Sequence, residues 1–362
     1  MFEGRRLRQA PLVGIAAAVF AVACGGSSTA SPTPADLGSG SLIGAGATFP
    51  APFYQKAFHD YQAKYPRVTV IYQALSSGAG ISAFQKGTVD FGASDVPMTD
   101  VDQAKVPGGA TGLVQVPTTL GVIAITYNLS GISKLQLDGP TLANIYLGHI
   151  SKWNDAQIAA LNSGVSLPNS AIQVVHRADS SGTTYHFTDY LSKVSDEWKT
   201  RVGVAKAVSW PAGVGAAQNA GVAQQVTSTS GAIGYNELAY VVQAGMSQAY
   251  LKNADGNYVQ ASVAGATAAA SQNTSVSPTN FSITNEPGPT SCPITAFSWV
   301  FLYTSYSDAA KGKAVVYLFK WLVTDGQSDG TSLQYAALPT AVQNLALTNL
   351  KTVQAGGKAV LS

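Results

Sequence analysis

Short apolar stretches alternate along this chain with stretches in which apolar residues recur at helical spacing. Residues 68–72 and 172–175 are short and rich in β-branched side chains, which is typical of buried strands. Residues 53–58, 81–86 and 185–191 show the spacing of amphipathic helices. This alternation of strands and helices predicts an α/β fold.

The same pattern continues through the rest of the chain. Two apolar stretches, 113–117 and 121–125, predict consecutive buried strands. Residues 294–303 predict another strand, and the helical pattern of 309–323 follows it. Residues 261–278, dominated by Ala, Ser, Thr and Val, predict a short helix and a surface loop. No internal repeat is evident.

Three of the predicted strand-to-helix turns carry small hydroxylated residues, at 44–52, 74–80 and 176–184. The first turn of a helix has unpaired N–H groups and the positive end of the helix dipole, so it attracts anions. In the last turn Arg177 adds a planar fork for two oxygens, and Gly182 lets backbone come close. Serine and threonine before a helix are also the usual N-caps, so the turns alone leave both interpretations open.

The sequence lacks the patterns that are typical of nucleotide-binding, catalytic and metal-binding sites. No turn has the G-x-x-x-x-G-K-[ST] sequence of a nucleotide P-loop, and GAGATF is not the G-x-G-x-x-G dinucleotide fingerprint. Ser, His and Asp residues within 176–186 invite a nucleophilic triad, but the chain has no G-x-S-x-G elbow. The four histidines do not form a metal-ligand pattern. We therefore predict a small anion as ligand, no enzyme activity and no metal.

Composition fits a folded binding protein. A chain of 362 residues with 46% hydrophobic and 11% charged residues can bury a substantial core, in about two domains. Beyond residue 23 it has 18 basic and 18 acidic residues, and a net charge near zero argues against a nucleic-acid partner. If Cys24 is modified, Cys292 has no intramolecular partner, and its apolar surroundings predict a buried, inert thiol.

The N-terminus predicts export. Three arginines within residues 5–8 precede an apolar stretch at 12–20, the layout of a secretory signal. The addition of Cys24 resembles a bacterial lipoprotein signal, in which residues 1–23 are cleaved off and Cys24 is acylated. Residues 24–40, rich in Ser, Thr, Ala, Pro and Gly, then predict a flexible tether to the membrane surface. The apolar stretch is too short for a permanent membrane span.

Four motifs in a fixed order carry a family resemblance. They read GAGATFPAP at 44–52, SSG at 76–78, DFGASD at 90–95 and RADSSGTT at 177–184. In this order and at these separations they resemble the substrate-binding protein of the high-affinity phosphate ABC transporter. The resemblance extends over most of the remaining chain, through IYLGHI at 145–150, GAIGY at 231–235, PIT at 293–295 and YAALP at 335–339.

The resemblance implies that inorganic phosphate is the ligand and that these motifs hold it. Carried over motif by motif, the phosphate ligands of the family fall on Thr48, Phe49, Ser76, Asp95, Arg177, Ser181, Gly182 and Thr183. Phe49 would act through its backbone N–H, and Asp179 resembles the carboxylate that pairs with the arginine. Ser180 stands where members of the family often have glycine.

Asp95 is the chemically unusual member of this set, because it is an acid among ligands for an anion. Phosphate near neutral pH still carries a proton, and a carboxylate can accept a hydrogen bond from that hydroxyl. Sulfate has no such proton, so its oxygens would face a negative charge in a dehydrated cleft, at a cost of roughly several kcal/mol. The alternative is that Asp95 only caps the turn before Pro97.

The resemblance also implies a two-lobed periplasmic-binding-protein architecture, with a hinge and a ligand cleft between the lobes. Lobe I would be discontinuous, at 41–117 and 297–362, and lobe II would be 118–296. A ligand that touches both lobes favours the closed state, which the permease subunits of an ABC transporter would recognise.

We expect a monomer without a cofactor, in the periplasm or at the outer face of the cell membrane. A phosphate sensor or scavenger without a transport role would have the same motifs. Another tetrahedral oxyanion, such as sulfate, is the alternative ligand, and Asp95 disfavours it.

Overall fold

The computed structural model describes residues 36–361 of the chain. The predicted signal peptide, Cys24 and most of the predicted tether lie outside these residues. The strands, in chain order, are β1 (Gly40–Gly46), β2 (Val68–Ala74), β3 (Phe91–Ser94), β4 (Leu113–Tyr127), β5 (Gln136–Leu137), β6 (Gln173–Arg177), β7 (Val214–Ala216), β8 (Ala232–Glu237), β9 (Ser247–Gln248), β10 (Tyr250–Lys252), β11 (Tyr258–Val259), β12 (Thr295–Tyr303), β13 (Ser305–Tyr306), β14 (Gln354–Ala355) and β15 (Lys358–Ala359).

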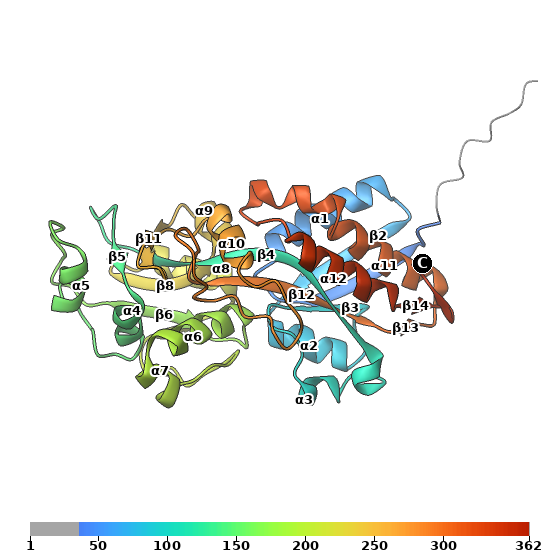
Figure 1. Ribbon diagram of the computed structural model, residues 1–362, viewed down its shortest axis with the longest axis horizontal. Coiled ribbons are helices and arrows are strands. Elements are labelled where there is room, and N and C mark those ends of the chain that lie inside the picture. Colours follow the sequence, from blue (N-terminus) through green and yellow to red (C-terminus); the bar gives the residue numbers. More distant parts are fainter. Residues whose placement is uncertain (1–35, 362) are drawn as a thin grey trace, which may run out of the picture. The chain divides into compact units, whose positions relative to one another are not determined.

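The helices cover both faces of the strands. They are α1 (Ala51–Lys64), α2 (Ser77–Gln85), α3 (Asp100–Gln103), α4 (Gly139–Tyr146), α5 (Ala156–Leu161), α6 (Gly182–Val194), α7 (Asp196–Arg201), α8 (Gln218–Ser228), α9 (Leu238–Gln243), α10 (Val263–Ala270), α11 (Ala309–Leu322) and α12 (Thr340–Lys351), with 3₁₀ turns η1 (Gly109–Gly112), η2 (Asp325–Asp329) and η3 (Thr331–Leu333). Figure 1 shows α1, α11 and α12 on one side of β3 and β12, and α2 and α3 on the other.

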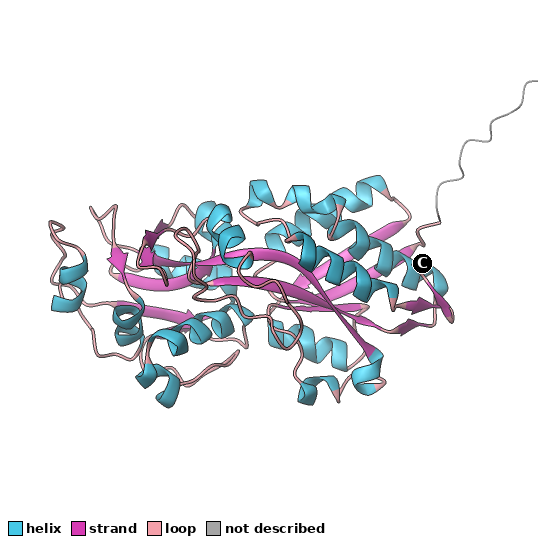
Figure 2. Cartoon of the chain, viewed as in Figure 1, coloured by secondary structure: helices cyan, strands magenta, loops and turns pink. Residues whose placement is uncertain are grey.

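One sheet joins two parallel groups of strands. Within residues 36–361 it has nine strands, in the order β2-β1-β3-β12-β4-β8-β6-β7, and β9 pairs with β4. β1 is parallel to β2 and β3, and β6 is parallel to β7 and β8. Between these groups lie β4 and β12, which are antiparallel to each other and to their neighbours. The fold is therefore a two-lobed α/β fold in which β4 and β12 belong to both lobes (Figure 2).

The two short strands predicted at 113–117 and 121–125 are one 15-residue strand, β4. Pro117 cannot donate to the ladder. The structure accommodates it with a β-bulge, because the register with β12 shifts between Ser298 and Trp299 and leaves Thr118 as the extra residue. The Thr118 hydroxyl donates to the carbonyl of Ser298 at 3.1 Å, so the strand continues through the bulge. The predicted lobe boundaries, 117/118 and 296/297, fall inside β4 and β12 and stay predictions.

Aromatic side chains form much of the core on which these elements rest. In one lobe Phe91 from β3 packs edge-on against Phe319 from α11, with ring centroids 4.9 Å apart. In the other, Phe187 from α6 stacks on Tyr235 from β8 at 4.2 Å. Burial of such a side chain stabilises the fold by about 1.5–3 kcal/mol. These contacts fix α11 and α6 against the sheet, and α6 carries one of the predicted anion-binding turns.

The prediction that Cys292 is buried is confirmed. It is the one cysteine within residues 36–361. Its thiol donates to the carbonyl of Gln260 at 3.4 Å. Burial raises the pKa of the Cys292 thiol, which disfavours the reactive thiolate.

Candidate functional site

Three of the four motifs, at 44–52, 76–78 and 90–95, lie together because the strands beside them are neighbours in the sheet. β1, β2 and β3 are adjacent and parallel, so their carboxyl ends meet at one edge of the sheet. Thr48 and Phe49 follow β1, Ser76 follows β2, and Asp95 follows β3 directly. All four residues are buried.

The fourth motif, at 177–184, contacts the other three from the second lobe. It runs from Arg177, the last residue of β6, into the first turn of α6. The backbone N–H of Gly182 donates to the hydroxyl oxygen of Ser77 at 3.0 Å. The N–H of Gly78 donates to the carbonyl of Ser180 at 2.9 Å. The structure thus places the four predicted segments in direct contact across the two lobes.

Two glycines make this close approach possible. A Cβ on Gly182 would lie 2.5 Å from Oδ2 of Asp95, and a Cβ on Gly78 would lie 2.6 Å from Oγ of Ser180. Real Cβ atoms do not come so close to another atom, so both positions require a residue without a side chain. The serine at position 180, where the family often has glycine, is accommodated because its neighbour is Gly78.

Ser76 and Ser181 are both helix N-caps. The Ser76 hydroxyl oxygen accepts from the N–H of Ala79 at 3.1 Å, and that of Ser181 accepts from the N–H of Thr184 at 3.3 Å. The cap interpretation that the sequence left open is therefore correct for both. It does not exclude anion binding, because a hydroxyl whose oxygen accepts the cap bond still has its O–H to donate.

Arg177 is held by Asp179 in a two-pronged pair. Its Nε donates to Oδ1 at 2.7 Å, and its Nη2 donates to Oδ2. Burial would raise the pKa of Asp179, but the hydrogen bonds and charge of Arg177 outweigh it and hold that pKa below its usual range. The guanidinium itself is buried. The pair fixes the plane of the guanidinium and leaves Nη1 to face the site, where it lies 3.4 Å from Oγ1 of Thr183.

Asp95 is a buried carboxyl group with few partners. The Ser298 hydroxyl donates to its Oδ1 at 2.7 Å, and the Ser77 hydroxyl lies 3.5 Å from its Oδ2. Burial raises the pKa of Asp95 to about 7, against the hydrogen bond from Ser298 and the charge of Arg177, which lower it. Asp95 is only 1% exposed. Its Oδ2 is therefore the acceptor that a ligand hydroxyl could use.

The contacts of Asp95 are not those of a turn cap. Its carboxylate meets serines from α2 and β12, whereas Ser94 caps the local turn, accepting from the N–H of Val96 at 3.0 Å. The carbonyl of Asp95 accepts a 2.7 Å hydrogen bond from Nε2 of His186, on α6. His186 is fully buried, and burial lowers its pKa, so it contributes a neutral donor to this contact.

A buried amide connects Thr48 and Thr183 across the lobes. Nδ2 of Asn219, in the first turn of α8, donates to Oγ1 of Thr48 at 3.0 Å and to Oγ1 of Thr183 at 3.3 Å. The backbone N–H of Asn219 also lies 3.4 Å from the same Thr48 oxygen. Both threonine oxygens therefore accept hydrogen bonds, and both keep an O–H to donate.

Sequence reasoning missed three residues of this site, Ser77, Asn219 and Ser298. Ser77 was within reach, because it belongs to the SSG motif beside Ser76. Ser298 had a weaker signal, as a lone hydroxyl inside the apolar stretch 294–303. Asn219 lies outside all the motifs, and only the fold brings it to Thr48, 171 positions away.

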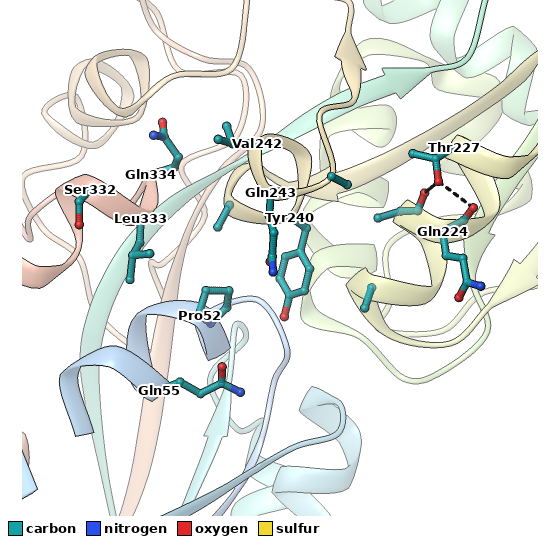
Figure 3. Close-up of a pocket in the computed structure, with 14 residues that line it drawn as sticks. Pro52, Gln55, Gln224, Thr227, Tyr240, Val242, Gln243, Ser332, Leu333 and Gln334 are labelled. Atoms are coloured by element: carbon teal, nitrogen blue, oxygen red, sulfur yellow. Dashed lines mark hydrogen bonds between the residues drawn. The ribbon is translucent and has the colours of Figure 1, made fainter. Parts of the chain in front are cut away.

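A hollow of about 990 Å³ lies beside these turns (Figure 3). It opens between Pro52 and Gln55 of one lobe, Tyr240 and Gln243 of the other, and η3. None of its lining residues is charged. Tyr240 belongs to its wall and also donates from its hydroxyl to the carbonyl of Thr48 at 2.7 Å. The uncharged hollow does not include the predicted anion ligands.

Residues 36–361 contain no cluster of three or more His, Cys, Asp or Glu side chains placed to hold a metal ion. They also contain no helix whose length and apolar character would let it cross a membrane.

The chain is similar to known proteins over most of its length. Residues 31–318 match the family model of the PBP superfamily domain. Phosphate-binding protein PstS of Xylella fastidiosa (strain 9a5c) is 42% identical over 318 residues, which are 87% of this chain and 86% of that protein. Phosphate-binding protein PstS of Methanocaldococcus jannaschii is 33% identical over 337 residues, 85% of either chain.

Solved structures share the fold. A high affinity periplasmic phosphate-binding protein (PfluDING) bound with phosphate superposes with a TM-score of 0.70 at 22% identity, over 85% of this chain and 93% of that one. A phosphate-binding protein from Stenotrophomonas maltophilia gives a TM-score of 0.67 at 18% identity, over 86% of this chain and 94% of that one. At these identities the likeness supports the two-lobed fold.

Proposed function

Because the chain belongs to the PBP superfamily and, within it, to the family of the PstS phosphate-binding proteins, we propose that it binds inorganic phosphate outside the cytoplasm. We propose further that it delivers this phosphate to an ABC importer. One observation carries the proposal. Four hydroxyl oxygens each accept a hydrogen bond from an N–H group, so their own O–H groups remain free to donate beside one buried acceptor, the carboxyl group of Asp95. The four hydroxyls belong to Thr48, Ser76, Ser181 and Thr183.

Many donors and one acceptor match a hydrogen phosphate ion. Its bare oxygens need donors, and its one hydroxyl needs an acceptor. We propose as phosphate ligands the eight residues that the motifs indicate: Thr48, Phe49 (through its N–H), Ser76, Asp95, Arg177, Ser181, Gly182 and Thr183. Asp179 orients the arginine. Because the Gly182 N–H donates to Ser77 in this structure, it would change partner when phosphate binds.

Asp95 sets the preference for phosphate over other tetrahedral oxyanions. A carboxylate buried to this degree gains a hydrogen bond from protonated phosphate but only repulsion from sulfate. The same reasoning admits arsenate, which is protonated in the same pH range as phosphate.

Lobe closure is the mechanism that we propose for signalling occupancy. Contacts between the lobes already hold the two sides together, including Gly182 with Ser77, Asn219 with Thr48, and Tyr240 with Thr48. A ligand held by both sides adds to these contacts only in the closed arrangement, and so shifts the population toward it. β4 and β12, which run through both lobes, are the proposed hinge.

We propose that the protein does no chemistry on its ligand. Both histidines near the turns contact backbone carbonyls: His176 lies 3.1 Å from that of Arg177, and His186 lies 2.7 Å from that of Asp95. Neither contact activates a serine, as a nucleophilic mechanism would need.

Restored transport separates an importer component from a sensor or scavenger. In cells that keep their own permease subunits but lack this chain, we expect reintroduced wild-type protein to restore uptake of radiolabelled phosphate. Protein carrying Arg177→Ala should not restore it. Wild-type protein that binds phosphate yet leaves uptake at the deletion level would mean a role without transport.

The lipid anchor is a separate proposal that rests on the sequence around Cys24. Cys24→Ser should abolish acylation and move the protein from the membrane fraction to the soluble fraction, with unchanged phosphate affinity, because residue 24 precedes both proposed lobes. One acyl chain holds a protein at a membrane only marginally, so stable attachment implies several chains. Mass spectrometry of the N-terminal peptide is the measurement.

Cys292→Ala is the matched control, since it removes the other thiol and should leave both the modification and the membrane attachment intact. An unmodified Cys24 in protein from its native cells would contradict the anchor.

The protein is further proposed to act as a monomer in the periplasm or at the outer face of the cell membrane.

A further inference from the structure

Both the nitrogen and the oxygen of the Asn219 side-chain amide have hydrogen-bond partners beside the proposed phosphate site. Asn219 is fully buried at the start of α8. Its Oδ1 accepts from the N–H of Glu237 at 3.3 Å, and its own carbonyl accepts from Nδ2 of Asn236 at 2.8 Å. The preceding residue, Gln218, has a φ of 66° and donates its N–H to Oδ1 of Asp179 at 3.1 Å.

These contacts decide which way the amide of Asn219 points. The N–H of Glu237 can only donate, so the side-chain atom that meets it must be the oxygen. The NH₂ group then faces the two threonines, at 3.0 Å from Thr48 and 3.3 Å from Thr183. An NH₂ group can only donate, and each threonine oxygen must therefore accept.

The orientation of the Asn219 amide also determines where the threonine hydroxyls can donate. A threonine O–H rotates freely, and its direction is set by the hydrogen bonds that the oxygen accepts. When its oxygen already accepts from Asn219, its hydrogen is directed away from the amide and is available to an anion. Thr48 belongs to the turn after β1 and Thr183 to the first turn of α6, so one amide sets the hydroxyl direction on both sides of the cleft.

We propose that Asn219 is a positioning residue that orients the hydroxyls of Thr48 and Thr183 as donors to phosphate. The inference rests on the proposed function, because it assigns a role toward the same ligand. Thr183 has a second donor, Nη1 of Arg177 at 3.4 Å, whereas the donors to the Thr48 oxygen both come from Asn219. The effect of Asn219 is therefore transmitted mainly through Thr48.

A double-mutant cycle tests this pathway on the purified full chain, with phosphate affinity as the measurement. Asn219→Ala should weaken phosphate binding by about 10-fold or more, the loss expected when donors to a charged ligand are no longer oriented. In a Thr48→Val background the same change should cost less than about 3-fold, since the hydroxyl that it orients is gone. In a Ser76→Ala background, where Asn219 makes no contact, the full loss should remain.

Asn219→Asp gives an independent readout. Its carboxylate would accept from the threonines and turn their hydrogens away from the ligand, so phosphate affinity should fall by more than in Asn219→Ala.

The phosphate-to-sulfate ratio of Asn219→Ala should stay at the wild-type value, because both anions use the same donors. A purely structural role predicts a lower melting temperature with additive losses in the cycle. Asn257→Ala, at an exposed asparagine, is the matched control and should change nothing.

If Asn219→Ala does not fold, Asn219→Ser keeps one hydroxyl donor and should show an intermediate loss that again disappears in the Thr48→Val background. Losses that multiply fully in that background, or a change below about 3-fold in Asn219→Ala, would overturn the inference. Wild-type protein that fails to bind phosphate at all would instead refute the proposed function, so the two failures are distinguishable.

Discussion

Replacing Arg177 by alanine is expected to lower phosphate affinity at least about 100-fold, the largest effect of any single change in the site. Each charge-assisted hydrogen bond contributes about 1.5–3 kcal/mol to binding. The buried guanidinium pairs with Asp179 and faces the proposed phosphate site with Nη1, so its removal would also leave Asp179 without this partner. Calorimetric titration with phosphate is the measurement.

The loss of Arg177 should also be visible in Asp179. Without the guanidinium, only backbone hydrogen bonds, including the one from the Gln218 N–H, oppose the effect of burial on that carboxyl group, so its pKa should rise. Arg177→Lys keeps a charge but cannot make the two-pronged contact, so it should recover only part of the affinity.

The matched control for Arg177 is Arg201→Ala. Arg201 is about half exposed and pairs with Glu197 on the surface of α7, so its loss should leave phosphate affinity unchanged. A folded Arg177→Ala protein that binds phosphate within about 3-fold of wild type would contradict the assignment of this arginine.

Asp95→Asn is expected to reduce the preference for phosphate over sulfate by about 10-fold or more, the value of one hydrogen bond to a charged group. The amide removes the negative charge that repels sulfate and adds an N–H that sulfate can accept. Phosphate affinity itself should fall less, because the lost hydrogen bond is partly offset by the lost repulsion. Asp255→Asn, at an exposed turn position, should leave the ratio unchanged.

The pH dependence of sulfate binding isolates the same group. The pKa of Asp95 is raised to about 7, so its carboxyl group gains a proton as the pH falls from 8 to 6. A protonated carboxyl can donate to sulfate, which stays a dianion over this range. Sulfate affinity of the wild-type protein should therefore rise as the pH falls, and Asp95→Asn should abolish that rise. A flat wild-type profile would contradict the role given to Asp95.

The sequence was informative wherever a short segment determined its own structure. The turns before α1, α2 and α6 were predicted from small hydroxylated residues between a strand and a helix, and Ser76 and Ser181 cap the helices at those places. β2, β6 and β12 lie close to the β-branched and apolar stretches that predicted them. These features depend on local preferences that a single sequence displays.

The contacts between distant segments could not be predicted from the residues alone. Ser298 meets Asp95 across 203 positions, and it does so beside the bulge that Pro117 introduces into β4. The apolar stretches predicted two strands where the structure has one, because the partner strand that accommodates Pro117 is not visible in the local sequence. Asn219 has no motif of its own, and its role depends on the two threonines that the fold brings to it.

Calorimetric titration of the purified full chain, stripped of copurified anion, tests the central claim most directly. With phosphate we expect one site per chain and a dissociation constant in the micromolar range or below, about −8 kcal/mol or more favourable. Arsenate should bind at the same site, and sulfate should bind at least about 100-fold more weakly at pH 8, because a buried carboxylate faces it. No heat with phosphate, or equal affinities for phosphate and sulfate, would contradict the account.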